Sequence, residues 1–230
     1  MWKRTDVRGN GMDEPTIRAV IFDLDGTLAD TVPVCFAAFR ITLKEFTGRD
    51  FSDSEIEALF GPDEAGVFQR LLGDHWKPAL LRYLNEYEIA HELCGAPFDG
   101  VVGLLDWLRK EGMKVAIVTG KGKQSAAISL RRVGLTSHFD MVEAGSHTGP
   151  VKPAAIKHIL ERWGLSPAQA VYVGDAPYDV RAAREAGVTP LSAVWAPRVH
   201  RDRLDAEKPD AILETVDDLK GWLAIRAETP

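Results

Sequence analysis

The stretch Arg18–Leu28, RAVIFDLDGTL, decides the fold of this chain. Its apolar run, Ala19 to Phe22, is short, partly β-branched and followed by turn residues, which predicts a strand buried on both faces of a parallel sheet. Ligands bind outside the carboxyl ends of such strands, so we expect Asp23 and Asp25 at an open edge of the sheet. Two carboxylates this close repel each other, and a bound cation would relieve the repulsion.

Two other interpretations of this stretch can be set beside a ligand site. One is a strand followed by an acidic turn that binds nothing. The other is an EF-hand calcium loop, which needs acids at alternate positions before its glycine and a glutamate six residues after it. In that frame Ile21 is the first position and Val32 the last, so the sequence excludes a calcium loop.

Composition narrows the class of protein. A chain of 230 residues with 45% hydrophobic content can bury one large domain, or a core domain and a smaller one. A net charge of −6 and the lack of a basic stripe argue against a nucleic-acid partner. Cys35 and Cys94 form no CxxC pattern, which favours a reducing compartment over a metal–thiolate site.

The sequence also indicates where the protein resides. No apolar run approaches the ~20 residues of a membrane span. The polar residues 1–16 lack the apolar core of a secretory signal and are expected to be mobile, with Met12 as an alternative first residue. We therefore expect a cytoplasmic protein with no membrane partner.

The first strand is followed by a block, residues 31–97, that is predicted to be all helical. Its first helix is expected to begin at Thr31, whose hydroxyl would cap it, with Pro33 in the first turn. Its last helix, near residues 78–93, is expected to bury the stripe Leu80, Leu84, Tyr87 and His91.

The rest of the chain alternates helices with strands, the strands being predicted at 114–119, 139–144, 170–173, 189–194 and 210–213. Such alternation implies a doubly wound, Rossmann-like α/β fold built on a parallel sheet. Because the helical block interrupts the first crossover, we expect it to be an inserted domain, residues 31–97. The core domain would then comprise residues 17–30 and 98–230.

Polar residues follow two further predicted strands, at the edge where Asp23 is expected. Thr119 and Gly120 end one strand, and Asp175 ends another, with Asp179 four residues later. Lys152 precedes the intervening helix. Taken singly, Thr119 is an ordinary strand-end residue, Lys152 a solvated lysine and Asp179 a helix cap. Together they supply acids for a divalent cation such as Mg²⁺, and a hydroxyl and amides for phosphate oxygens.

These motifs resemble those of the haloacid dehalogenase superfamily. Asp23-Leu-Asp25-Gly26-Thr27 is similar to its DxDGT motif, and Gly174-Asp175-Ala-Pro-Tyr-Asp179 to its GDxxxD motif. Thr119 and Lys152 stand where its second and third motifs are found, and residues 31–97 stand where it places a helical cap. The Gly-Thr-Leu-x-Asp-Thr run and Lys121 most resemble the phosphoglycolate phosphatase-like group, although Gly120 replaces the more usual asparagine.

The resemblance implies a Mg²⁺-dependent phosphatase. Asp23 would be the nucleophile that forms an aspartyl-phosphate, and Asp25 the general acid and base. The metal would be held by Asp23, Asp175 and the Asp25 carbonyl, with Asp179 binding directly or orienting the others. The remaining implied roles are a charge-neutralising lysine, Lys152, and phosphate or substrate contacts by Gly26, Thr27, Thr119, Gly120 and Lys121. A solvated loop lysine is an equal alternative for Lys121.

Three functions remain open at this point. The first is hydrolysis of a small phosphorylated metabolite, by a monomer or a homodimer. The second is a phosphosugar mutase with the same kind of cap, which would need a longer-lived aspartyl-phosphate. The third is a phospho-receiver or binding module without turnover, although receivers have no helical insertion after the first strand.

Overall fold

The computed structural model describes residues 16–227, apart from the side chain of Leu93. All but one residue of the segment expected to be mobile, 1–16, therefore lies outside the described part. Within residues 16–227 the chain forms one parallel sheet in the order β3-β2-β1-β4-β5-β6. The strands are β1 (Ala19–Phe22), β2 (Lys114–Val118), β3 (Met141–Glu143), β4 (Ala170–Gly174), β5 (Thr189–Ala193) and β6 (Ala211–Leu213).

Strand β1 lies at the centre of this sheet. Ile21 pairs with Ala116 of β2 on one side and with Tyr172 of β4 on the other, both in parallel register. All four β1 residues are buried, as expected for a strand covered on both faces. The predicted doubly wound α/β fold is thereby confirmed.

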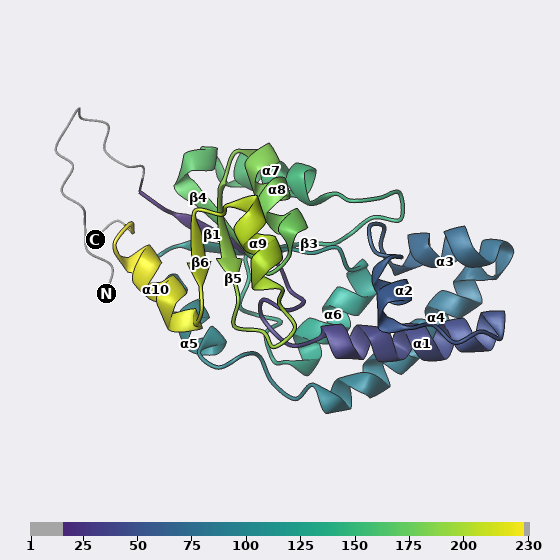
Figure 1. Ribbon diagram of the computed structural model, residues 1–230. Helices are drawn as coiled ribbons and strands as arrows, with labels where there is room; N and C mark the ends of the chain where they lie inside the picture. Colours follow the sequence, from purple (N-terminus) through teal and green to yellow (C-terminus); the bar gives the residue numbers. More distant parts are fainter. Residues whose placement is uncertain (1–15, 228–230) are drawn as a thin grey trace.

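Helices cover both faces of the sheet because successive β1 side chains point to opposite sides. Ala19 and Ile21 pack with residues of α7 (Lys152–Trp163) and α8 (Pro177–Ala186). Val20 and Phe22 belong to the larger core cluster, which includes α5 (Val101–Lys110), α6 (Lys123–Arg132) and α10 (Val216–Ala224). Figure 1 shows this layered core, in which α9 (Arg201–Glu207) packs against α8.

The helical insertion, residues 31–97, lies to one side of the sheet (Figure 1). It contains α1 (Val32–Thr47), α2 (Asp53–Glu57), α3 (Glu64–Leu72) and α4 (Trp76–Ala90), with short 3-10 turns at Gly73–His75 and His91–Leu93. The aromatic rings of Phe39, Phe68, Tyr83 and Tyr87 pack together inside it. Its status as a separate cap domain stays a prediction.

Two local predictions for the insertion were wrong in part. Tyr87 and His91 of the predicted stripe are buried, but Leu80 and Leu84 are only half-buried, and Ala79 and Tyr83 of α4 are buried instead. The helix begins two residues earlier than expected, and its buried face also contacts α1 and α3, so apolar spacing alone misplaced the first two members of the stripe by one position. Thr31 does precede α1, but its hydroxyl makes no capping hydrogen bond.

Other boundaries differ by a few residues, as is usual at element ends. The predicted strands 139–144 and 210–213 shorten to Met141–Glu143 and Ala211–Leu213. Helix α9, Arg201–Glu207, was not predicted. It buries only Leu204 fully, so it lacks the apolar periodicity that marks a longer helix.

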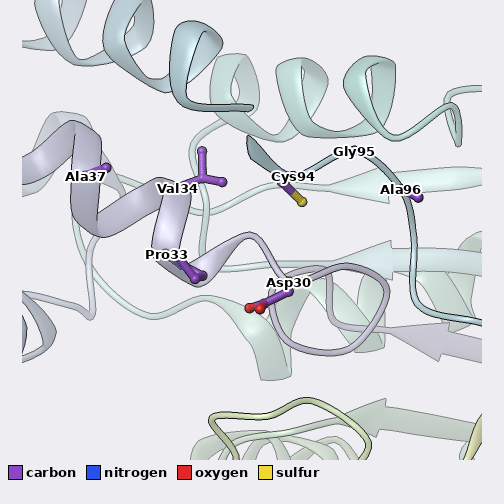
Figure 2. Close-up of a pocket in the computed structure, with 7 residues that line it drawn as sticks. All are labelled: Asp30, Pro33, Val34, Ala37, Cys94, Gly95 and Ala96. Carbon is purple, nitrogen blue, oxygen red and sulfur yellow. The ribbon is translucent and has the colours of Figure 1, made fainter. Parts of the chain in front are cut away.

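The chain enters and leaves the insertion at one place. A pocket of about 290 Å³ is lined by Asp30, Pro33, Val34 and Ala37 on the way in, and by residues 94–96 on the way out. Figure 2 shows the two connections facing each other across this pocket. The insertion is therefore tethered through two adjacent segments, which we call the paired connections.

Candidate active site

The carboxyl ends of three neighbouring strands, β2, β1 and β4, form the candidate site. Each strand runs into a polar turn, so parallel pairing brings Thr119, Asp23 and Asp175 to the same edge. The turn after β1 depends on Gly26, which has a φ of +73°. A Cβ there would lie 2.2 Å from Asp175 Oδ2, so only glycine lets Asp175 approach the β1 turn.

Three carboxylates gather at this edge. Asp23, Asp175 and Asp179 each offer an oxygen within 4.8 Å of the others. Lys152 Nζ lies 3.0 Å from Asp23 Oδ2 and 2.6 Å from Asp179 Oδ1. The cluster thus holds three acids against one ammonium, and we call these four residues the acid cluster.

Burial and neighbouring charges shift the pKa values of Asp23, Asp175 and Lys152. Desolvation raises the pKa of Asp23 to about 7, although the nearby Lys152 ammonium opposes this shift. Desolvation and the charges of Asp23 and Asp179 also hold the pKa of Asp175 well above its ordinary value. Burial alone would lower the pKa of Lys152, but the carboxylates of Asp179 and Asp23 raise it well above normal. Lys152 is therefore a permanent cation.

The acid cluster fits a divalent cation. The Oδ1 atom of Asp23 is buried and has no hydrogen-bond partner within the described residues. A buried polar atom of this kind is costly unless a ligand satisfies it. Carboxylate oxygens are also the donors that hard cations such as Mg²⁺ and Ca²⁺ prefer. The carboxylate donors and the unpaired Asp23 Oδ1 atom therefore both favour a cation at this edge of the sheet.

Asp179 serves two structural purposes at once. Its Oδ2 accepts a hydrogen bond of 3.0 Å from the Ala176 N–H at the start of α8, as the helix-cap alternative predicted. Its Oδ1 faces Lys152 and lies 3.2 Å from the hydroxyl of Tyr172, which also bonds the Val118 carbonyl at 2.9 Å. No sequence pattern indicated this role of Tyr172, because a tyrosine inside a buried strand is usually an ordinary core residue.

Asp25 stands apart from the acid cluster, beside Lys121. Lys121 Nζ is 3.1 Å from Asp25 Oδ1 and 4.5 Å from the centre of the Tyr87 ring. Thr31 donates its hydroxyl to the same Asp25 oxygen, which explains why it does not cap α1. Lys121 is only 6% exposed, so the solvated-lysine alternative is wrong.

The predicted phosphate contacts surround the same edge. Thr27 donates its hydroxyl to Asp175 Oδ1 at 3.1 Å, and Thr119, which is 1% exposed, accepts the Lys121 N–H at 3.2 Å. Gly120 follows as an exposed residue. The structure thus brings all the predicted site residues to one edge, while their contacts with phosphate and metal stay predictions.

One buried residue near the site was missed. Glu64, the first residue of α3, is 6% exposed and bonds Gly122 and Ser125 at the start of α6. A glutamate in the first turn of a helix is normally explained by the helix dipole. No sequence signal indicated that its partners lie in another helix.

Comparisons with known proteins identify the family. The family model for haloacid dehalogenase-like hydrolases matches residues 20–193. The chain is 34% identical over 220 residues to a phosphoglycolate phosphatase from Pseudomonas putida, covering 90% of this chain and 78% of the relative. It is 28% identical over 211 residues to the pyrophosphatase PpaX from Bacillus velezensis, covering 90% and 97%.

A solved structure agrees with these sequence relatives. A haloacid dehalogenase-like family hydrolase from Streptococcus pneumoniae superposes with a TM-score of 0.72 at 27% identity, covering 91% of this chain and 98% of that one. The chain therefore belongs to the haloacid dehalogenase-like hydrolases, and the resemblance to the superfamily is confirmed. Among residues 16–227, every helix is too short or too polar to cross a bilayer.

Proposed function

We propose that this protein is a Mg²⁺-dependent phosphatase that hydrolyses a small phosphorylated metabolite through an aspartyl-phosphate. The observation that carries the proposal is the acid cluster, with Asp23 at the end of the central strand and Lys152 beside it. Membership of a hydrolase family supports an enzyme over the phospho-receiver alternative. The expected location is the cytoplasm.

The carboxylates of Asp23 and Asp175 and the main-chain carbonyl of Asp25 would hold the Mg²⁺ ion, and Asp179 would orient them. When bound, the ion neutralises charge on the phosphoryl group and on the nucleophile. Lys152 contributes a second, permanent positive charge 3.0 Å from Asp23. Asp23 can then remain ionised next to a phosphate dianion, which its burial would otherwise oppose.

The chemistry proceeds in two balanced steps. Asp23 attacks phosphorus through a carboxylate oxygen, the bond to the substrate oxygen breaks, and Asp25 gives its proton to that oxygen. Water then attacks the same phosphorus and gives a proton to Asp25. The bond between phosphorus and the Asp23 oxygen breaks, so that phosphate is released and the Asp23 carboxylate is restored. Thr119, Gly120, Gly26 and Thr27 would bind the phosphoryl oxygens that carry the charge in both steps.

The insertion is inferred to act as a cap, residues 31–97, over a core of residues 17–30 and 98–230. Asp25 already touches it through Thr31. Relatives of this chain are named phosphoglycolate phosphatase and pyrophosphatase, and both names denote substrates with a second anionic group. We infer that Lys121, buried beside the insertion residue Tyr87, binds such a second anion.

Phosphate release from a substrate panel tests the proposal. The panel comprises p-nitrophenyl phosphate, 2-phosphoglycolate, pyrophosphate, sugar phosphates and nucleotides, each assayed with and without Mg²⁺. Release that requires Mg²⁺ and disappears in Asp23→Asn, with the circular dichroism of that variant unchanged, is the expected result. Retained activity in Asp23→Asn would overturn the mechanism. Sugar phosphate isomerisation dependent on a sugar 1,6-bisphosphate would instead identify a mutase.

A further inference from the structure

A carboxylate of the insertion is docked on the core. Glu64 Oε2 accepts the N–H of Gly122 at 2.7 Å, and Glu64 Oε1 accepts the hydroxyl of Ser125 at 2.6 Å. Both donors lie at the start of α6, which begins directly after the loop of Thr119 and Lys121. The first N–H groups of a helix have no partner inside it. Glu64 supplies the missing acceptor from another part of the chain.

The segment around Glu64 meets the core a second time. The Asp63 N–H donates to the Ser146 carbonyl at 2.9 Å, and a Cβ on Gly66 would lie 2.4 Å from the His147 carbonyl oxygen. Figure 1 shows the loop between β3 and α7 reaching toward α3. Residues 63–66 therefore dock on two core loops, one following Thr119 and the other preceding Lys152.

The docked arrangement covers the proposed nucleophile. Asp23 is 7% exposed, Thr119 1% and Lys152 7%, so little of these side chains is accessible in this conformation. The chain passes between the core and the insertion at the paired connections, which lie together at the pocket of Figure 2. Helix α4 of the insertion also contacts α6 of the core, where the Tyr87 hydroxyl lies 2.8 Å from Ser129 Oγ. Motion about the paired connections would separate α3 from α6, so each catalytic cycle would break and remake the Glu64 contacts.

We propose that Glu64 is a positioning residue that latches the insertion onto α6 and thereby fixes the Lys121 loop against Asp25 during catalysis. The inference rests on the proposed phosphatase function. A buried carboxylate is costly without full hydrogen bonding, and the start of α6 satisfies both oxygens of Glu64. The two Glu64 hydrogen bonds therefore add to the other contacts that hold the docked state, among them Asp63 with Ser146 and Tyr87 with Ser129.

Steady-state kinetics with the best substrate of the panel test the latch. Hydrogen bonds to charged groups imply that Glu64→Ala lowers kcat/KM about tenfold to a hundredfold. Glu64→Gln keeps an acceptor for Gly122 and should recover most of this loss. Ser125→Ala removes one donor from the other side and should have a smaller effect. Glu57→Ala, at an exposed glutamate of α2, is the matched control and should leave kcat/KM unchanged.

A double-mutant cycle separates a latch from a merely stabilising glutamate. If Glu64 and Ser125 act on each other, the double alanine variant should be no slower than Glu64→Ala alone. Additive losses would mean that Glu64 does not act through the Ser125 hydrogen bond on which the latch depends, and an unchanged kcat/KM in Glu64→Ala would mean that closure does not need this side chain. Either result overturns the inference while leaving the phosphatase proposal intact.

Hydrogen–deuterium exchange tests the same contact without turnover. Glu64→Ala should speed amide exchange at the starts of both α3 and α6, while strands β1 and β4 keep their wild-type protection. Glu57→Ala should match the wild type throughout. Unchanged exchange at the start of α6 would refute the latch even if the wild-type protein released no phosphate from any panel compound.

Discussion

Replacing Asp175 with asparagine is expected to change stability in opposite directions in the absence and presence of Mg²⁺. In the metal-free protein, three carboxylates each have an oxygen within 4.8 Å of the others, and within residues 16–227 Lys152 is the cation that pairs with them. At this separation and an effective dielectric constant of 20, one pair of like charges repels by about 3 kcal/mol. Because desolvation and the neighbouring carboxylates raise the pKa of Asp175, proton uptake already relieves part of this repulsion. Asparagine, which is neutral at every pH, removes the remainder and keeps an oxygen to accept the Thr27 hydroxyl.

In the presence of Mg²⁺, Asp175→Asn is expected to lower the stability of the folded protein relative to the wild type. An ion at one hundred times its dissociation constant stabilises the folded wild-type protein by about 2.7 kcal/mol. For a chain of this length, that energy corresponds to a rise in Tm of about 5–11 °C. Asp175→Asn loses a charged ligand and should gain little from Mg²⁺. The variant should thus melt above the wild type in EDTA and below it in saturating Mg²⁺.

Differential scanning fluorimetry across a Mg²⁺ titration at low ionic strength measures both effects. Asp106→Asn, at an exposed position of α5, makes the same charge change away from the acid cluster and should follow the wild-type titration. An equal Mg²⁺-induced rise in Asp175→Asn and the wild type would refute the assigned metal ligand. A markedly lower Tm of Asp175→Asn in EDTA would refute the repulsion argument.

Three further changes probe neighbouring parts of the site. Tyr172→Phe removes a buried hydroxyl that bonds a β2 carbonyl and lies beside Asp179. Urea denaturation should show that the free energy of unfolding falls by about 1–3 kcal/mol, and an unchanged value would contradict a stabilising role for those hydrogen bonds. Gly66→Ala should lower kcat/KM, because its Cβ would collide with the His147 carbonyl and obstruct docking of the insertion. Gly103→Ala, in open space on α5, should leave kcat/KM unchanged, and equal kinetics of the two variants would contradict the close contact at Gly66. Asp25→Asn treated with p-nitrophenyl phosphate should accumulate phosphorylated protein in intact-mass spectra, and its absence would deny the base role.

The sheet was predictable because its strands carry strong local signals. The β1 run matches the structure residue for residue, since a short apolar run ending in two acids and a glycine has few other uses. The acid cluster followed from topology, because parallel strands place their carboxyl ends at one edge. The parallel arrangement of β1 and β4 was sufficient to predict that Asp23 and Asp175 lie close together.

The contacts between the insertion and the core were not predictable in the same way. The sequence around Thr31 is typical of a helix cap, yet its hydroxyl donates to Asp25. The hydrogen bond to this more distant partner replaces the capping hydrogen bond within α1. Glu64 looks like a favourable first-turn acid and proves to be a partner of α6. The sequence favoured neither a solvated nor a substrate-binding role for Lys121. The structure excludes the solvated role, because Lys121 is buried beside Asp25.

The central position of β1 has a consequence for how the chain folds during synthesis. Thr27 and Asp175, which bond each other in the finished site, lie 148 residues apart in sequence. At typical translation speeds the first waits roughly 7–30 s for the second to emerge from the ribosome. Throughout that time one edge of β1 lacks its β4 partner, so a nascent chain would expose an apolar strand edge suited to chaperone binding or aggregation. The mutually repelling acids also meet only once the sheet closes around them, so the apolar core can form before they do.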